Sequence, residues 1–105
     1  MTEIFVVQVE ASPDGVIHSD SEFGGAYINV YTTALNIRDA IDAAEKEVLE
    51  AGWRIERVVS ATLSSAADFE GDDSGLRYYE QAVLEGRVVV VHIFPPEHAE
   101  SDFLH

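Results

Sequence analysis

The fold is decided by one stretch of the sequence, NIRDAIDAAEKEVLEAGW, which runs from Asn36 to Trp53. Apolar residues recur in it at i, i+4, i+7 and i+11, so they form one stripe along a helix of about residues 37–51. The residues of this stripe are Ile37, Ile41, Ala44 and Val48. Asn36 can cap the first turn, and Gly52 stands where a left-handed residue ends a helix, so that Trp53 can pack back on Val48. The stretch therefore predicts an amphipathic helix with a single face to bury.

Strand patterns flank this helix on both sides. Before it, residues 4–11 and residues 26–32 alternate between two faces, as half-buried strands do. After it, a third strand is predicted over residues 53–63. Arg57 interrupts the apolar parity of that strand, which a β-bulge or exposure on one side would explain. The run Val88–Phe94 is apolar on both parities, which indicates a central strand or one covered on both faces.

A second helix is predicted over residues 75–85. Residues 72–74 can cap its first turn and complement its dipole, and Gly86 can end it. Its predicted buried side consists of Leu76, Tyr79 and Val83. Residues 16–25 form a polar loop that could hold a short hairpin, and Pro95-Pro96 ends the last strand.

The predicted order is β-β-α-β-α-β, which favours an α+β domain. We expect a single four-stranded sheet with both helices packed on one face, because each amphipathic helix has one stripe to bury. Two strand–helix–strand units suggest right-handed crossovers, but the long link at residues 64–73 would also let the last strand run antiparallel. In helix and sheet content the chain resembles ferredoxin-like two-layer sandwiches, although its element order departs from their βαββαβ pattern. The 105 residues fit a single domain over residues 1–96, followed by a C-terminal tail at residues 97–105.

Charge and composition exclude several classes of function. A formal charge of −14 argues against electrostatic binding of nucleic acid, and the lack of cysteine excludes a disulfide framework, a zinc–thiolate site and a cysteine nucleophile. The acidity has two interpretations: adaptation to high salt or a compositional bias, and a surface shaped for a basic partner protein. No apolar run is long enough to span a membrane and the N-terminus lacks the pattern of a secretory signal, so a cytoplasmic location is expected.

With both helices on one face, the other face of the sheet needs a cover. By strand parity that face carries large apolar, aromatic and polar side chains, which could form a patch larger than the few hundred Å² usual for a monomer. The residues that we single out there for an interface or a ligand are Tyr27, Asn29, Tyr31, His92 and Phe94. We predict a homodimer through this face or along a sheet edge, with another protein or the chain's own loop and tail as alternative covers.

The titratable side chains give weaker signals. His92 could act as a general base beside Tyr27 or Tyr31, but no partnered nucleophile is identifiable, so a hydrogen-bonded interface histidine is the better interpretation. The segment His18–Glu22 alternates three possible metal ligands, yet a polar stretch in an acidic loop is usually solvated. Counted from Asp68, the segment has Asp73 at the sixth position, where a calcium loop requires glycine, and Tyr79 at the twelfth, where it requires glutamate, so helix capping explains the acidic side chains better. We therefore assign no metal, cofactor or catalytic residue.

Two functions of different classes remain. The first is a non-enzymatic module for protein–protein interaction, and its sharpest version is an inhibitor or immunity-type protein that neutralises a basic partner. The charge favours this function, as does the lack of phosphate-loop, dinucleotide-loop and nucleophile-elbow motifs. The alternative is a small-molecule-binding or enzymatic domain with a pocket on the sheet face near Tyr27, Tyr31 and His92.

Overall fold

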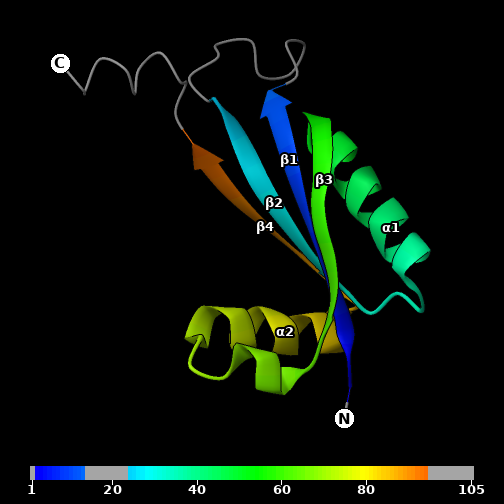
Figure 1. The fold of residues 1–105 in the computed structure, drawn as a ribbon, viewed down its shortest axis with the longest axis vertical. Helices are drawn as coiled ribbons and strands as arrows, with labels where there is room; N and C mark the ends of the chain where they lie inside the picture. Colours follow the sequence, from blue (N-terminus) through cyan, green and yellow to red (C-terminus); the bar gives the residue numbers. More distant parts are fainter. Residues whose placement is uncertain (1, 14–23, 95–105) are drawn as a thin grey trace, which may run out of the picture.

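The computed structural model of the protein describes residues 2–13 and 24–94. In these ranges it contains one four-stranded sheet, two α-helices and a short 3₁₀ helix (Figure 1). The strands are β1 (Ile4–Pro13), β2 (Gly25–Thr32), β3 (Trp53–Ser64) and β4 (Arg87–Phe94), and the helices are α1 (Ile37–Glu50), η1 (Ala66–Phe69) and α2 (Asp73–Glu85). The predicted α+β class and element order are confirmed. Most of the predicted polar loop at residues 16–25 and the predicted tail lie outside the described residues.

The predicted helices agree with the structure to within two residues at each end: α1 ends one residue before the predicted end, and α2 begins two residues before the predicted start. The side chain of Asn36 accepts a hydrogen bond from the N–H of Asp39 at 2.9 Å, and that of Asp72 accepts one from the N–H of Gly75 at 2.9 Å. Gly52 and Gly86 follow the two helices with φ of 90° and 92°, a left-handed conformation that favours glycine. Neither helix in the described part of the chain is long and apolar enough to span a lipid bilayer.

The sheet has the order β3-β1-β2-β4, and every neighbouring pair is antiparallel. It follows that β4 runs antiparallel to β3, as the long link between them allows. The prediction that the apolar run Val88–Phe94 forms a central or doubly covered strand is wrong, because β4 lies at an edge of the sheet. Val89, Val91 and Ile93 are 37%, 41% and 51% exposed. Apolar residues on both parities indicate two apolar faces, but they do not determine how many strands lie beside them.

The two helices pack on opposite faces of the sheet, whereas the sequence pattern predicted both on one face. Neighbouring residues of a strand point to opposite faces. α1 packs in one core with Val7 and Ile28, and α2 packs in another with Ile4 and Tyr31. The apolar first half of β1 contributes side chains to both cores, so each helix packs on apolar residues of its own face. α2 lies across one end of the sheet and leaves the other end of its face without a helix (Figure 1).

β3 contains the β-bulge that Arg57 suggested. Its pairing with β1 shifts by one residue at two points, next to Val58 and next to Arg57. The shifts place Val58 against the α1 core, where unbroken alternation would have placed Val59. Arg57 faces the opposite side of the sheet and pairs there with Glu10. The two irregularities therefore give β3 both a buried apolar side and a charged side.

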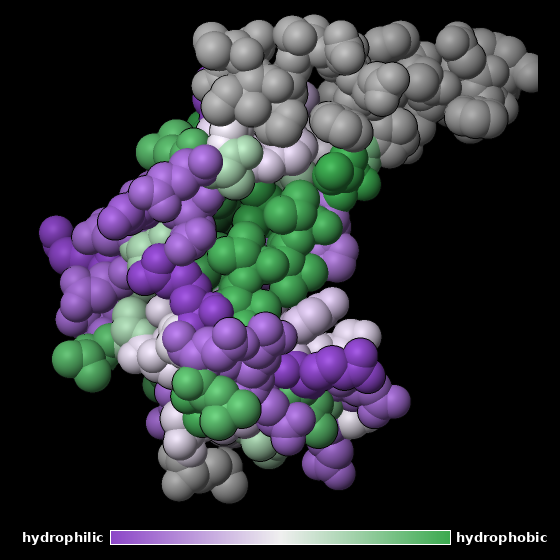
Figure 2. All heavy atoms as spheres, turned by 180° about the vertical axis from the view of Figure 1, so that it is seen from behind, coloured by the Kyte–Doolittle hydropathy of each residue, from purple (hydrophilic) through white to green (hydrophobic). Residues whose placement is uncertain are grey.

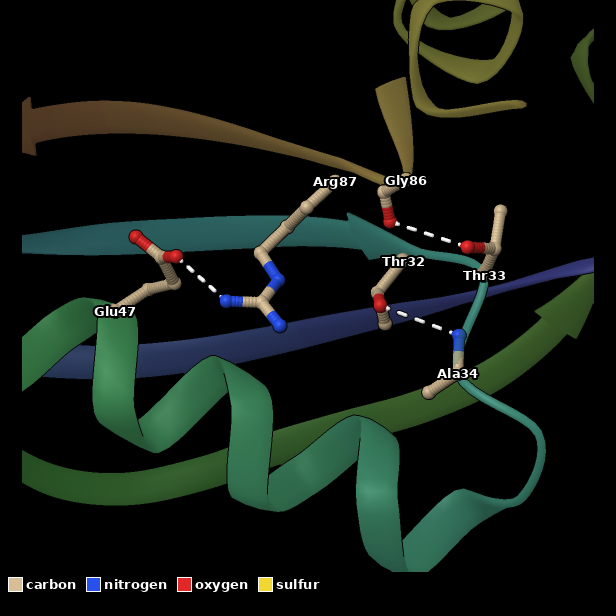
Figure 3. A network of polar contacts seen from close by, with 6 residues as sticks. All are labelled: Thr32, Thr33, Ala34, Glu47, Gly86 and Arg87. Atoms are coloured by element: carbon tan, nitrogen blue, oxygen red, sulfur yellow. Dashed lines mark hydrogen bonds and ion pairs between the residues drawn. The ribbon is translucent and has the colours of Figure 1, made fainter. Parts of the chain in front are cut away.

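Polar contacts fix the start of β4 against its neighbours (Figure 3). The carbonyl of Gly86 accepts hydrogen bonds from the N–H of Thr33 at 3.1 Å and from its hydroxyl at 3.3 Å. Nη1 of Arg87 lies 2.7 Å from Oε1 of Glu47, so the arginine side chain reaches from β4 to α1. These contacts hold the start of β4 to the end of β2 and to α1.

Candidate functional site

The structure brings the five residues singled out from the sequence to one face of the sheet, the face opposite α1. Three of them alternate along β2, and two lie on β4. Tyr27 stands directly across from His92, and Phe94 stands across from Gly25. Their shared face follows from the antiparallel register, because residues opposite each other in neighbouring strands point the same way.

Tyr31 differs from the other four because α2 and η1 cover it. It is 7% exposed, and its ring lies 6.0 Å from the ring of Phe69 and 5.6 Å from that of Tyr78. Burial raises the pKa of the Tyr31 hydroxyl, and the nearby charge of Asp72 and the hydroxyl of Tyr78 raise it further. Tyr31 therefore belongs to the core beneath α2, and a surface for an external partner has to use the remaining residues.

We call those four residues, Tyr27, Asn29, His92 and Phe94, the open face. The rings of Tyr27 and Phe94 contact each other with centroids 5.4 Å apart, a favourable distance for aromatic packing. Asn29 lies across from Gln8 on one side and from Val90 on the other. The open face thus combines aromatic area with amide and imidazole groups, as the cores of protein interfaces commonly do.

Two charged residues that sequence reasoning did not assign to the site extend this face across the sheet. Register places Glu10 beside Tyr27 and Arg57 beside Glu10, so one row runs from β3 to His92 on β4. Nε of Arg57 donates a hydrogen bond to Oε1 of Glu10 at 2.7 Å. This bond, together with the charge of Glu10, raises the pKa of the Arg57 guanidinium. The interruption of parity at Arg57 was the sequence signal for this row.

One pocket in the described part of the chain lies away from the open face. It is lined by Ile37, Arg38, Ile41 and Asp42 of α1, on the other side of the sheet from Tyr27. Among residues 2–13 and 24–94, no three His, Asp or Glu side chains are grouped so that they could hold a metal ion. The metal hypothesis for His18–Glu22 lies outside the described residues.

The outer edge of β4 is a second feature of this site, and the sequence had indicated it only as an unspecified sheet edge. The N–H of Thr33 donates to the carbonyl of Gly86, so the backbone groups of Gly86 face β2. Hydrogen-bonding direction alternates along an antiparallel strand. After Arg87, the residues whose N–H and C=O groups consequently face away from β2 are Val89, Val91 and Ile93, which we call the β4 edge. No other strand of the described chain pairs with them.

The opposite edge of the sheet is built differently. β3 has two register irregularities and carries the charged side chains of Arg54, Glu56 and Arg57. Bulges and charges are the devices by which proteins prevent a sheet edge from pairing with another chain. β4 has an unbroken register with β2, and no charged residue lies between Val88 and Phe94. The side chains of the β4 edge are 37–51% exposed. A broad hydrophobic area lies beside a charged surface in the space-filling view (Figure 2).

Comparison of the chain with protein-family models, with curated proteins and with solved structures found no match.

Proposed function

We propose that the protein is a non-enzymatic protein–protein interaction module that binds a partner strand along the β4 edge. The observation that carries this proposal is an exposed, uncharged and regular strand edge in a protein whose other edge is bulged and charged. A strand added beside β4 would satisfy the outward N–H and C=O groups of Val89, Val91 and Ile93 and would cover their side chains. The open face adjoins this edge, since His92 and Phe94 belong to β4 itself.

Two kinds of partner fit the proposal. A second copy of the chain is favoured because two-fold dimers are the commonest oligomers. A basic protein is the alternative that the charge of −14 suggests, and the protein would then act as an inhibitor of the immunity type. The two differ in their response to salt. Binding between two acidic copies strengthens as salt rises, whereas binding to a basic partner weakens.

The test places one charge on the β4 edge. Val91→Lys puts an ammonium on a side chain that is already 41% exposed, so the fold should persist while strand pairing is blocked. We expect the variant to lose self-association in sedimentation velocity, or to lose capture of a basic protein in a pull-down at low salt. The matched control is Leu63→Lys on β3, at the opposite edge of the sheet, where the side chain is 49% exposed. Equal association by wild type and Val91→Lys would contradict the proposal.

A further inference from the structure

The outward backbone groups of β4 are arranged symmetrically about one residue. Val89 and Ile93 stand two residues before and after Val91, and all three direct their N–H and C=O groups away from β2. An antiparallel copy of the same strand, related by a two-fold axis at Val91, would offer its groups at the same spacing. Val91 would then form a hydrogen-bonded pair with its own copy, and Val89 would pair with the second copy's Ile93.

Only this register pairs the three residues of the β4 edge exclusively with one another. A shift of two residues in one direction places Arg87 opposite Ile93, although the guanidinium of Arg87 is engaged by Glu47 on α1. A shift in the other direction places Val89 opposite residue 95, a proline, which has no N–H to donate. The sequence at the two ends of β4 therefore favours the arrangement centred on Val91.

The side chains agree with the backbone in this arrangement. Val89, Val91 and Ile93 all point to the α1 face, because they stand opposite Val30, Ile28 and Ala26 of β2. In the pair, valine would meet valine at the axis and isoleucine on either side, and cross-strand pairs of β-branched residues stabilise antiparallel sheets. On the other face His92 would stand opposite the second copy's Val90, so the two open faces would become continuous.

The strand edge itself carries no charge that would keep a second copy away from it. Acidic residues dominate the exposed surfaces of both helices, whereas β4 has no charged side chain after Arg87. Pairing along β4 therefore brings no like-charged side chains of Val88–Phe94 into contact. A strand from a basic partner would find no carboxylate along the edge to recognise.

We infer that two copies of the chain pair their β4 strands antiparallel about a two-fold axis at Val91. Resting on the proposed function, this inference names its partner and its register. The result is one continuous sheet of eight strands, in the order β3-β1-β2-β4-β4-β2-β1-β3. Both outer edges are then the bulged and charged β3, so the assembly closes at two copies and does not continue into a fibre.

A cysteine scan of β4 tests the register, since the chain has no cysteine of its own. Hydrogen-bonded residues opposite each other lie about 5.5 Å apart between their Cα atoms, within the span of roughly 4.4–6.8 Å that a disulfide bridges. Val91→Cys should therefore yield a covalent dimer under mild oxidation, which a denaturing gel without reductant detects. Val89→Cys alone should not, because the two copies of residue 89 would lie four residues apart along the strands, roughly 13 Å.

Mixed variants provide the matched control. An equimolar mixture of Val89→Cys and Ile93→Cys chains should cross-link into a heterodimer, while either variant alone should stay monomeric on the gel. Cross-linking of Val90→Cys in place of Val91→Cys would place the axis elsewhere and overturn the inference, while leaving binding at the β4 edge intact. If no variant cross-links and Val91→Lys leaves a native association unchanged, the proposed function fails as well. Circular dichroism of each variant confirms that it is folded.

Discussion

Gly25 shows how closely β2 approaches its neighbours. A Cβ built on this residue would stand 2.6 Å from Cζ of Phe94 and 2.7 Å from the carbonyl oxygen of Ala11. The phenylalanine ring can move, but the backbone of a neighbouring strand cannot do so without loss of pairing. We predict that Gly25→Ala lowers the free energy of unfolding by about 1–3 kcal/mol, as overpacking does. Urea denaturation measures this loss.

The background variant Phe94→Ala separates the two contacts of Gly25. If the carbonyl of Ala11 is the main obstacle, Gly25→Ala destabilises the Phe94→Ala protein nearly as much as it does the wild type. Full tolerance of alanine in that background would show that the ring of Phe94 alone excludes a larger residue.

Tyr31 provides a prediction about alkaline pH. Its pKa is raised above the ordinary value of 10.0, because burial, Asp72 and Tyr78 all disfavour the phenolate. The folded state therefore holds this proton more tightly than the unfolded state does. The corresponding stabilisation is fully present below pH 10 and is lost as pH rises through the higher pKa of the folded protein. We predict that Tyr31→Phe reduces the loss of stability above pH 10, as measured by thermal unfolding at a series of pH values.

Ultraviolet titration of the phenolates provides the control for this prediction. Tyr27 lies on the same strand and is 36% exposed, so it is the matched position outside the core. Tyr31→Phe should remove a tyrosine transition that lies above pH 10 in the folded protein, and Tyr27→Phe is the matched variant that retains Tyr31. Loss of an earlier transition on replacing Tyr31 would contradict the direction of the shift.

The start of α1 depends on Asn36 in two ways. Its Oδ1 accepts from the N–H of Asp39 at 2.9 Å, and its Nδ2 donates to the carboxylate of the same residue at 3.1 Å. We predict that Asn36→Ala costs about 1 kcal/mol of stability, the usual effect of losing a helix cap. Asn36→Asp keeps the acceptor but brings two carboxylates together, so it should recover only part of the loss at neutral pH. Denaturant titration of wild type and the two variants measures both effects, and an Asn36→Asp variant as stable as wild type would show that the donated bond contributes nothing.

The ends of the two helices are also the features that the sequence predicted best. Asn36, Gly52, Asp72 and Gly86 act within a few residues of themselves, so the ends of both helices could be derived without knowing the fold. The β-bulge next to Arg57 was similarly visible as a break in alternation.

Strand order and the faces taken by the helices depend on contacts between distant segments, which local patterns do not encode. Apolarity of Val88–Phe94 predicted burial, but α1 covers β1, β2 and β3 and leaves β4 at the edge. Contacts between distant segments also separate Tyr31 from the other four residues of the candidate site. Parity correctly placed Tyr27, Tyr31 and His92 on one face, but the covering of Tyr31 by α2 and η1 could only be seen in three dimensions.

At the scale of the whole molecule, charge and apolar edge act in opposite directions. Each copy carries a formal charge of −14, so two copies repel at long range even where their contact is uncharged. The screening length falls from about 10 Å at 0.1 M salt to about 3 Å at 1 M salt. The repulsion between copies therefore weakens with salt, while burial of Val89, Val91 and Ile93 does not depend on charge.

We predict accordingly that self-association strengthens as salt rises, with a dissociation constant lower at about 1 M than at about 0.1 M salt. Sedimentation equilibrium of the full chain at several salt concentrations measures the trend. Replacing Glu45 and Asp42 on α1 by their amides removes charge without touching β4, so this variant should associate more tightly at low salt and show a shallower salt dependence. Self-association that weakens with salt would instead mean that opposite charges hold the copies together. The arginines of β3, and not the apolar edge of β4, would then be the place to seek the contact.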